Sequence, residues 1–227
     1  MLLQFDRIAK DQTDHIGIEI KSLVIAGWAG RDAAAIEHHI EELAALGIPR
    51  PSTTPLYYRV AAQTLTQASC LTVLGPDSSG EVEPIVVAMA DGLWIGIGSD
   101  HTDRKAEASG IALSKQLCGK PVGAQLWSYA EIEGHWDQLL LRSWATIDGK
   151  RVLYQESPVS SLRTPRDLIR RYAGADTLPA GTLMFCGTPG AIGGIRPGSR
   201  FELELRDPVL DRALTHGYDI AVLPVVS

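Results

Sequence analysis

The chain of 227 residues is 45% hydrophobic, which is enough to bury a sizeable core, and its length favours a single domain, 1–227. Its formal net charge of −6 argues against nucleic acid or an anionic membrane surface as a partner, because phosphate binding needs a basic patch. No apolar run approaches the roughly 20 residues that span a bilayer. No basic start followed by an apolar block marks a secretory signal, so we expect a cytoplasmic protein.

Apolar alternation and short apolar runs predict many strands. In chain order these fall at 17–26, 56–60, 68–74, 85–90, 93–98, 124–127, 139–147, 151–155, 182–186, 200–205 and 219–226. Helical spacings predict helices at 31–46, 103–117 and 164–172, with Asp32 capping the first and Thr164 capping the last. Asp-Gly turns at 91–92 and 148–149 predict two hairpins. Many short strands and few helices indicate an antiparallel-rich α+β fold.

The cysteines, Cys70, Cys118 and Cys186, are odd in number and widely spaced, with no CxxC pair. This pattern indicates neither a disulfide framework nor a zinc site. We expect reduced thiols in the core.

Carboxylates lie at the start of the first strand and at the end of the second strand of the first predicted hairpin. Glu81 and Glu83 point to one face because residues two apart in a strand do so. The turn at 91–92 brings Asp100, at the end of the second strand, back beside them. Converging carboxylates repel unless a cation lies between them, and Mg²⁺ or Mn²⁺ prefers such oxygen ligands. The alternative is a solvated strand edge without a metal.

His39 and Glu42 lie three residues apart on the first predicted helix and are therefore neighbours on one face. The carboxylate can orient the imidazole, and such a pair can act as general base on water. A His and a Glu on a polar helix face are also typical of a solvated surface, and His38 and Glu41 have the same spacing.

Three further features fit an anionic ligand. The turn containing Gly187 and Thr188 presents backbone N–H groups and a hydroxyl after a buried strand. Lys115 ends the helix that follows Asp100, and Arg31, at a helix start, suits a substrate carboxylate. Each has an ordinary alternative: a plain turn, or a solvated side chain.

These motifs follow one another in a fixed order from about residue 24 to the end of the chain. They are Gly30-Arg31-Asp32, His39-Ile40-Glu41-Glu42-Leu43, Pro55-Leu56-Tyr57-Tyr58, Glu81-Val82-Glu83, Ser99-Asp100-His101-Thr102-Asp103-Arg104, Ser114-Lys115, Gly149–Gln155 and Cys186-Gly187-Thr188-Pro189. The ordered set resembles the fumarylacetoacetate hydrolase superfamily, as a diverged bacterial branch of unknown function.

The resemblance implies a mixed β-roll or sandwich of that superfamily's C-terminal-domain type, with a few peripheral helices and a homodimeric assembly. Residues 1–50 would form an N-terminal strand and a lid helix. The metal ligands would be Glu81, Glu83 and Asp100, and the catalytic residues His39, Glu42 and Lys115. Substrate would meet Arg31, Gln155, Gly187 and Thr188.

Departures from the family pattern accompany these likenesses. The turn at 91–92 replaces a helix, Ser99 stands where Asn is usual, and no Tyr follows Asp32. The connection from Asp100 to Lys115 is short, and Lys120 fits the usual spacing without the usual neighbours.

We therefore hold two hypotheses. The first is a metal-dependent hydrolase or lyase that acts on a small oxo-acid or β-diketo acid through an enolate chelated to Mg²⁺ or Mn²⁺, as a C–C hydrolase, decarboxylase, hydratase or isomerase. The second is a non-catalytic member of the fold that binds a small carboxylate.

Overall fold

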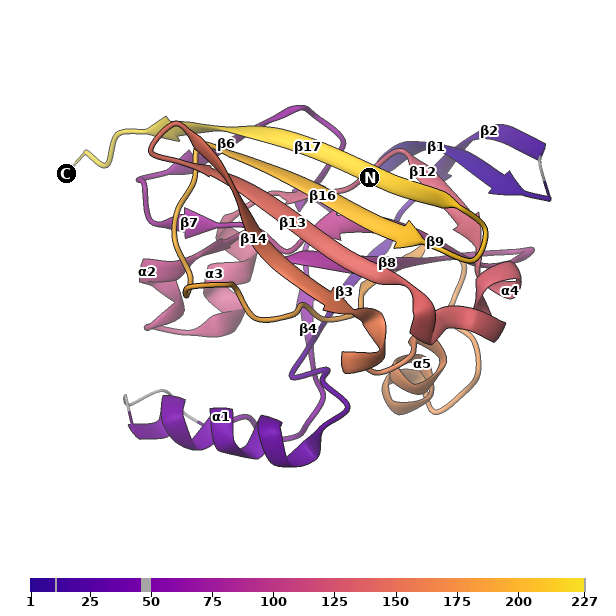
Figure 1. The fold of residues 1–227 in the computed structure, drawn as a ribbon, viewed down its shortest axis with the longest axis horizontal. Helices are drawn as coiled ribbons and strands as arrows, with labels where there is room; N and C mark the ends of the chain where they lie inside the picture. The colour runs from indigo at the N-terminus through magenta and orange to yellow at the C-terminus, as the bar shows by residue number, and fades with distance from the viewer. Residues whose placement is uncertain (11, 46–49, 227) are drawn as a thin grey trace.

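The computed structural model describes residues 1–10, 12–45 and 50–226, with the side chains of 39, 42, 43 and 45 left out (Figure 1). Its strands are β1 (Leu2–Ala9), β2 (Gln12–Glu19), β3 (Ser22–Gly27), β4 (Leu56–Val60), β5 (Leu65–Thr66), β6 (Cys70–Leu74), β7 (Ser78–Ser79), β8 (Val82–Met89), β9 (Gly92–Ser99), β10 (Thr102–Asp103), β11 (Lys120–Pro121), β12 (Gln125–Ser128), β13 (Leu140–Ile147), β14 (Lys150–Pro158), β15 (Thr182–Phe185), β16 (Arg200–Asp207) and β17 (Arg212–Leu223). Its α-helices are α1 (Ala33–Ala45), α2 (Arg104–Glu107), α3 (Ile111–Leu117), α4 (Tyr129–Ile132) and α5 (Pro165–Ala173). Short 3-10 turns are η1 (Ala62–Thr64), η2 (Glu133–Gln138) and η3 (Val159–Ser161).

Two large sheets make up the described part of the chain. The eight-stranded sheet has the order β2-β1-β12-β9-β8-β15-β3-β4, and the five-stranded sheet has the order β14-β13-β16-β17-β6. In Figure 1 the strands β13, β14, β16 and β17 cross over β8 and β9. One apolar cluster joins the facing sides, with Val86 and Ile95 from one sheet and Leu203 and Leu205 from the other. The mixed α+β class with few helices is therefore confirmed.

The β8–β9 hairpin is central because apolar side chains cover both of its faces. A second cluster, with Phe5, Ile85, Val87 and Leu126, packs on the side away from the five-stranded sheet. Every residue of β8 except the last is buried. A strand buried on both faces needs a near-continuous apolar run, and 85–88 supplies one. The end of this hairpin is thereby fixed deep in the molecule.

The helices lie at the periphery and begin where their caps dictate. Asp32 Oδ1 accepts hydrogen bonds from the backbone N–H groups of Ala34 and Ala35 (2.9 and 3.0 Å) at the start of α1. Thr164 caps α5 in the same way, and Gly174, with φ of 66°, ends that helix. Both predicted caps are confirmed. No helix in the described residues is long and apolar enough to cross a bilayer.

Several predicted elements are wrong in extent. The strand expected over 17–26 is two strands, because the backbone N–H of Ile20 bonds to Met1 O (2.7 Å) and that of Lys21 bonds to Gly181 O (2.8 Å). The helix expected over 103–117 is split into α2 and α3 at Gly110. The strand pairs are mostly antiparallel, as expected, with a few parallel pairs such as β3 with β15.

The cysteine prediction holds for two of the three residues. All three thiols are free, and Cys118 and Cys186 are buried. Cys70 is exposed because it lies on the outward face of β6, where burial alternates along the strand.

Candidate metal centre

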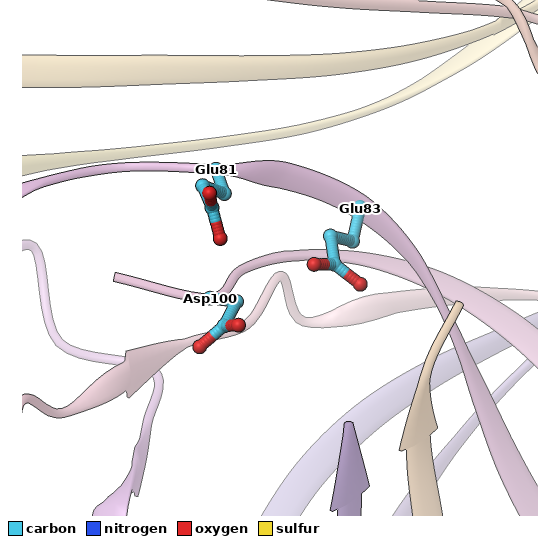
Figure 2. Close-up of side chains that lie close together, drawn as sticks. All are labelled: Glu81, Glu83 and Asp100. Atoms are coloured by element: carbon cyan, nitrogen blue, oxygen red, sulfur yellow. The ribbon is translucent and has the colours of Figure 1, made fainter. Parts of the chain in front are cut away.

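Glu81, Glu83 and Asp100 come together at one end of the β8–β9 hairpin (Figure 2). The turn at 91–92 sets an antiparallel register in which Val82 faces Ser99. The backbone N–H of Asp100 bonds to Glu81 O (3.0 Å), which extends the pairing by one step. One oxygen from each carboxylate lies within 4.8 Å of the others. The local hairpin, predicted from sequence, is thus what brings these side chains together.

The three carboxylates differ in exposure. The residue Asp100 is 0% exposed and Glu83 is 2% exposed, whereas the side chain of Glu81 retains 17% exposure. Burying ionised carboxylates side by side is unfavourable unless positive charge compensates them. Carboxylates that stay ionised here therefore require positive charge nearby.

Three basic side chains supply that charge. Lys115 forms an ion pair with Asp100 Oδ2, and its Nζ lies 3.6 Å from Glu81 Oε2. Lys120 Nζ, fully buried, lies 3.0 Å from Asp100 Oδ1 and donates to the backbone carbonyl of His101 (2.5 Å). Arg104 lies 3.1 Å from Glu81 Oε1. Both lysines weighed in the sequence analysis thus contact the same aspartate.

The pKa values of the two buried acids move in opposite directions. Burial, and next the charge of Asp100, raise the pKa of Glu83 well above its usual range. Burial alone would also raise the pKa of Asp100, but Lys115 and Lys120 outweigh it and lower that pKa. Glu83 therefore has less compensating positive charge nearby than Asp100 has.

The donor set fits a divalent metal ion. Asp100 Oδ1 is buried and accepts no hydrogen bond from the described residues, despite its ion pair with Lys120. Within the same part of the chain, Glu83 forms no ion pair and uses Oε2 to accept the backbone N–H of Gly187 (2.6 Å). Clustered carboxylate oxygens are the ligands that Mg²⁺ and Mn²⁺ prefer, and here one oxygen from each residue lies within 4.8 Å of the others.

Gly187 and Thr188, which we expect to contact substrate, bond to the hairpin in this structure. Thr188 Oγ1 donates to Val82 O (2.9 Å), and Gly187 N–H is occupied by Glu83. Gln155 Nε2 donates to Thr188 Oγ1 (2.8 Å) and Pro189 O (2.6 Å), while its Oε1 accepts the N–H of Val82 (3.0 Å). These residues therefore fix the positions of Glu83 and of the strand that carries it.

Arg31 is not brought to the carboxylates. Its Nε donates to Leu162 O (2.6 Å) and its Nη1 to Asp137 Oδ2 (2.8 Å). His39 and Glu42 belong to the backbone of α1, but their side chains lie outside the described residues.

A chain of buried polar side chains, which includes His101, adjoins the site and reaches the backbone of Glu81. His101 Nδ1 lies 3.0 Å from Tyr218 Oη, and His101 Nε2 lies 2.9 Å from Ser78 Oγ. Tyr218 donates to Ser99 Oγ (2.7 Å), which accepts the N–H of Glu81 (3.1 Å). Burial, and next the charge of Lys120, lower the pKa of His101 to about 3. The imidazole is therefore neutral at pH 7 and positions its neighbours.

Comparisons with known proteins agree with this architecture. Solved structures of similar fold include Cg1458 (18% identity, TM-score 0.65, covering 91% of this chain and 78% of that chain). They also include 2-keto-3-deoxyarabinonate dehydratase (17%, 0.65, 91% and 75%). A third is the 2-keto-3-deoxy-D-arabinonate dehydratase complexed with magnesium and 2,5-dioxopentanoate (16%, 0.60, 92% and 75%). Among curated proteins none matches.

At these identities the likeness shows the fold alone. The neighbours share the general mixed α+β fold of this chain, so the expected fold is confirmed at that coarse level. The sequence profile of one family, described as a protein of unknown function (DUF2848), matches residues 26–218. The chain belongs to that family.

Proposed function

We propose that this protein is a metal-dependent enzyme that acts on a small oxo-acid, with Glu81, Glu83 and Asp100 as the ligands of Mg²⁺ or Mn²⁺. The observation that carries the proposal is the convergence of three carboxylate oxygens within 4.8 Å, on a hairpin whose position the core fixes. The solved dehydratase complex with magnesium and 2,5-dioxopentanoate supports it, since that protein shares the fold.

The chain's own residues would divide the work as follows. A bound divalent ion would act as a Lewis acid on a carbonyl oxygen of the substrate. Asp100 and Glu83 are buried and would hold the ion, and the Lys115 ammonium, beside Asp100, would attract the substrate carboxylate. His39 and Glu42 on α1 would move the proton as a general base.

In several reactions of oxo-acids, negative charge develops on the carbonyl oxygen as an enolate forms. Hydrolysis of a C–C bond, decarboxylation, hydration or dehydration, and isomerisation all use it. We therefore propose the substrate class, and the screen described below identifies the reaction. A cytoplasmic homodimer is part of the same proposal.

One observation favours a second candidate, a non-catalytic protein that binds a small carboxylate. Lys115, Lys120 and Arg104 pair with two of the three carboxylates, Asp100 and Glu81, without a metal. A site neutralised in this way could hold an anion on its lysines and carry out no reaction.

The test of the metal centre is Mn²⁺ titration by calorimetry on the wild type and on Glu83→Gln and Glu83→Ala. We expect Mn²⁺ binding by the wild type and its loss in both variants. The matched control, Glu19→Gln, alters an exposed glutamate on β2 and should bind as the wild type does. Unchanged affinity in Glu83→Ala would remove the metal centre and leave the second candidate.

Activity is tested by a metal-supplemented screen with products identified by mass spectrometry. The compounds are oxaloacetate, acylpyruvates, hydroxy-dienoates and 2-keto-3-deoxy sugar acids. Turnover that requires both added metal and intact Glu83 supports the enzyme, whereas binding of these acids without any product favours the carboxylate-binding protein.

A further inference from the structure

Lys115 lies inside the group of carboxylates that would hold the metal. Its Nζ pairs with Asp100 Oδ2 and lies 3.6 Å from Glu81 Oε2, and its side chain is only 8% exposed. A metal bound to these oxygens at about 2.0–2.6 Å would lie next to the position that the Lys115 ammonium now occupies. Two cations so close together repel strongly in a buried site.

The other two basic side chains are tied to groups outside the carboxylate set. Lys120 donates to the carbonyl of His101 (2.5 Å). Arg104 donates to Ser79 Oγ (2.7 Å) and to Glu107 Oε2 (3.1 Å). Each can stay in place when a metal takes over its carboxylate, because these contacts do not depend on that carboxylate.

Lys115 has no such tie within the described part of the chain. Its polar contacts are with Asp100 and Glu81, both proposed metal ligands. Its remaining contact is the ring of Tyr58, whose centroid lies 5.7 Å from Nζ. An aromatic face attracts an ammonium weakly and offers it a second position.

The helix that carries Lys115 is itself lightly held. α3 has seven residues, of which only Ser114 and Lys115 are buried, while Leu113 and Leu117 are 53% and 57% exposed. Gly110 precedes it without a side-chain cap. A short helix that buries so little apolar area can shift at small cost.

Resting on the proposed function, we propose that Lys115 is a built-in counter-ion of the metal centre: it occupies the carboxylate cage in the metal-free protein, and the divalent ion displaces it. Displacement turns the ammonium toward Tyr58 and away from Asp100 and Glu81. Asp100 and Glu81 therefore keep a counter-charge in the metal-free protein. The same lysine lowers metal affinity, since each binding event must break its ion pairs.

The test compares Mn²⁺ affinity in the wild type, in Lys115→Met and in Lys105→Met. Methionine keeps the length and apolar stem of lysine but removes the charge. We expect Lys115→Met to bind Mn²⁺ about tenfold or more tightly, because no ammonium competes for the carboxylates. Lys105, exposed on α2, is the matched control and should leave the affinity unchanged. Calorimetry and the electron paramagnetic resonance signal of free Mn²⁺ both measure the Mn²⁺ affinity.

The outcomes separate the two proposals. Equal or weaker binding in Lys115→Met, together with loss of binding in Glu83→Gln, overturns the counter-ion role and leaves the metal centre intact. Binding that survives Glu83→Gln, or no binding by the wild type and Lys115→Met alike, overturns both. Circular dichroism of each variant with and without Mn²⁺ shows that folded protein is compared.

A second measurement follows the displacement directly in the wild type. Protein labelled with nitrogen-15 in its lysines is titrated with Mg²⁺, which is diamagnetic. We expect the Nζ resonance of Lys115, assigned by its absence in Lys115→Met, to shift by more than that of Lys120. A Lys115 resonance that stays in place while Mg²⁺ binds contradicts displacement.

Discussion

The backbone N–H of Gly187 donates a hydrogen bond to Glu83 Oε2 over 2.6 Å, joining residues 104 positions apart in the sequence. Through this bond, the turn that follows β15 fixes the carboxylate of Glu83, near the start of β8. Gly187 has φ of 96° and is therefore in the left-handed region, where a side chain is strained. A Cβ at this position would also lie 2.7 Å from the Cβ of Ala29.

Gly187→Ala should therefore cost both stability and metal binding. We expect a loss of about 2 kcal/mol or more in the free energy of unfolding, from backbone strain and overpacking. Mn²⁺ should bind more weakly because Glu83 loses its fixed position. Urea unfolding and calorimetry measure the two effects. The control is Gly134→Ala, where a Cβ meets nothing within 4 Å, and equal stability of the two variants would contradict the argument.

The second prediction concerns the contribution of Lys120 to stability. Its side chain and that of Asp100 are both 0% exposed, so removing the ammonium leaves a buried carboxylate that faces Lys115 alone. We expect Lys120→Met to lose about 3–5 kcal/mol of unfolding free energy. Lys150→Met, on an exposed residue of β14, should change stability by less than about 0.5 kcal/mol. A stable Lys120→Met protein would show that Lys115 alone compensates Asp100.

The hairpin at the site was predictable because its determinants are local. The turn at 91–92 and the apolar runs beside it fix the register of β8 and β9 without reference to the rest of the chain. The meeting of Glu81 and Glu83 with Asp100 follows from that register alone. The caps Asp32 and Thr164 were predictable for the same reason, since a cap bonds within its own first turn.

The partners of charged residues were not predictable, since tertiary structure decides them. Arg31 at a helix start suits a carboxylate, and it has one, but this is Asp137, 106 positions away. Lys120 reaches Asp100 from β11 after the chain has passed through two short helices. Spacing indicated that one lysine serves the site, and the packing of α3 brings Lys115 there as well.

Gln155 gives a prediction about the support of the metal centre. Its amide connects Val82, Thr188 and Pro189 and is only 2% exposed, so its loss leaves buried polar groups unsatisfied. We expect Gln155→Met to lose about 1–3 kcal/mol of unfolding free energy and to bind Mn²⁺ more weakly. Gln138→Met, exposed on η2, is the control. Weaker Mn²⁺ binding without loss of stability would instead assign Gln155 to direct metal or ligand contact.

Asp207, at the end of β16, predicts a pH dependence that does not involve the metal centre. Burial alone would raise its pKa, but hydrogen bonds from His135 (3.1 Å) and from the backbone N–H of Leu210 (3.1 Å) outweigh burial and lower it. A carboxyl whose pKa is lower in the folded than in the unfolded protein stabilises the fold above its unfolded pKa, about 4. That stabilisation is lost as the pH falls through the folded pKa.

Asp207→Asn should therefore be less stable than the wild type by about 1–3 kcal/mol at pH 7, and the difference should shrink as the pH falls below about 4. Asp211→Asn, whose side chain is 86% exposed in the wild type, should differ from the wild type by less than about 0.5 kcal/mol at pH 7. Urea unfolding at a series of pH values measures both variants. A constant gap between Asp207→Asn and the wild type down to pH 3 would mean that Asp207 acts through its shape rather than its charge, since an uncharged contribution does not titrate.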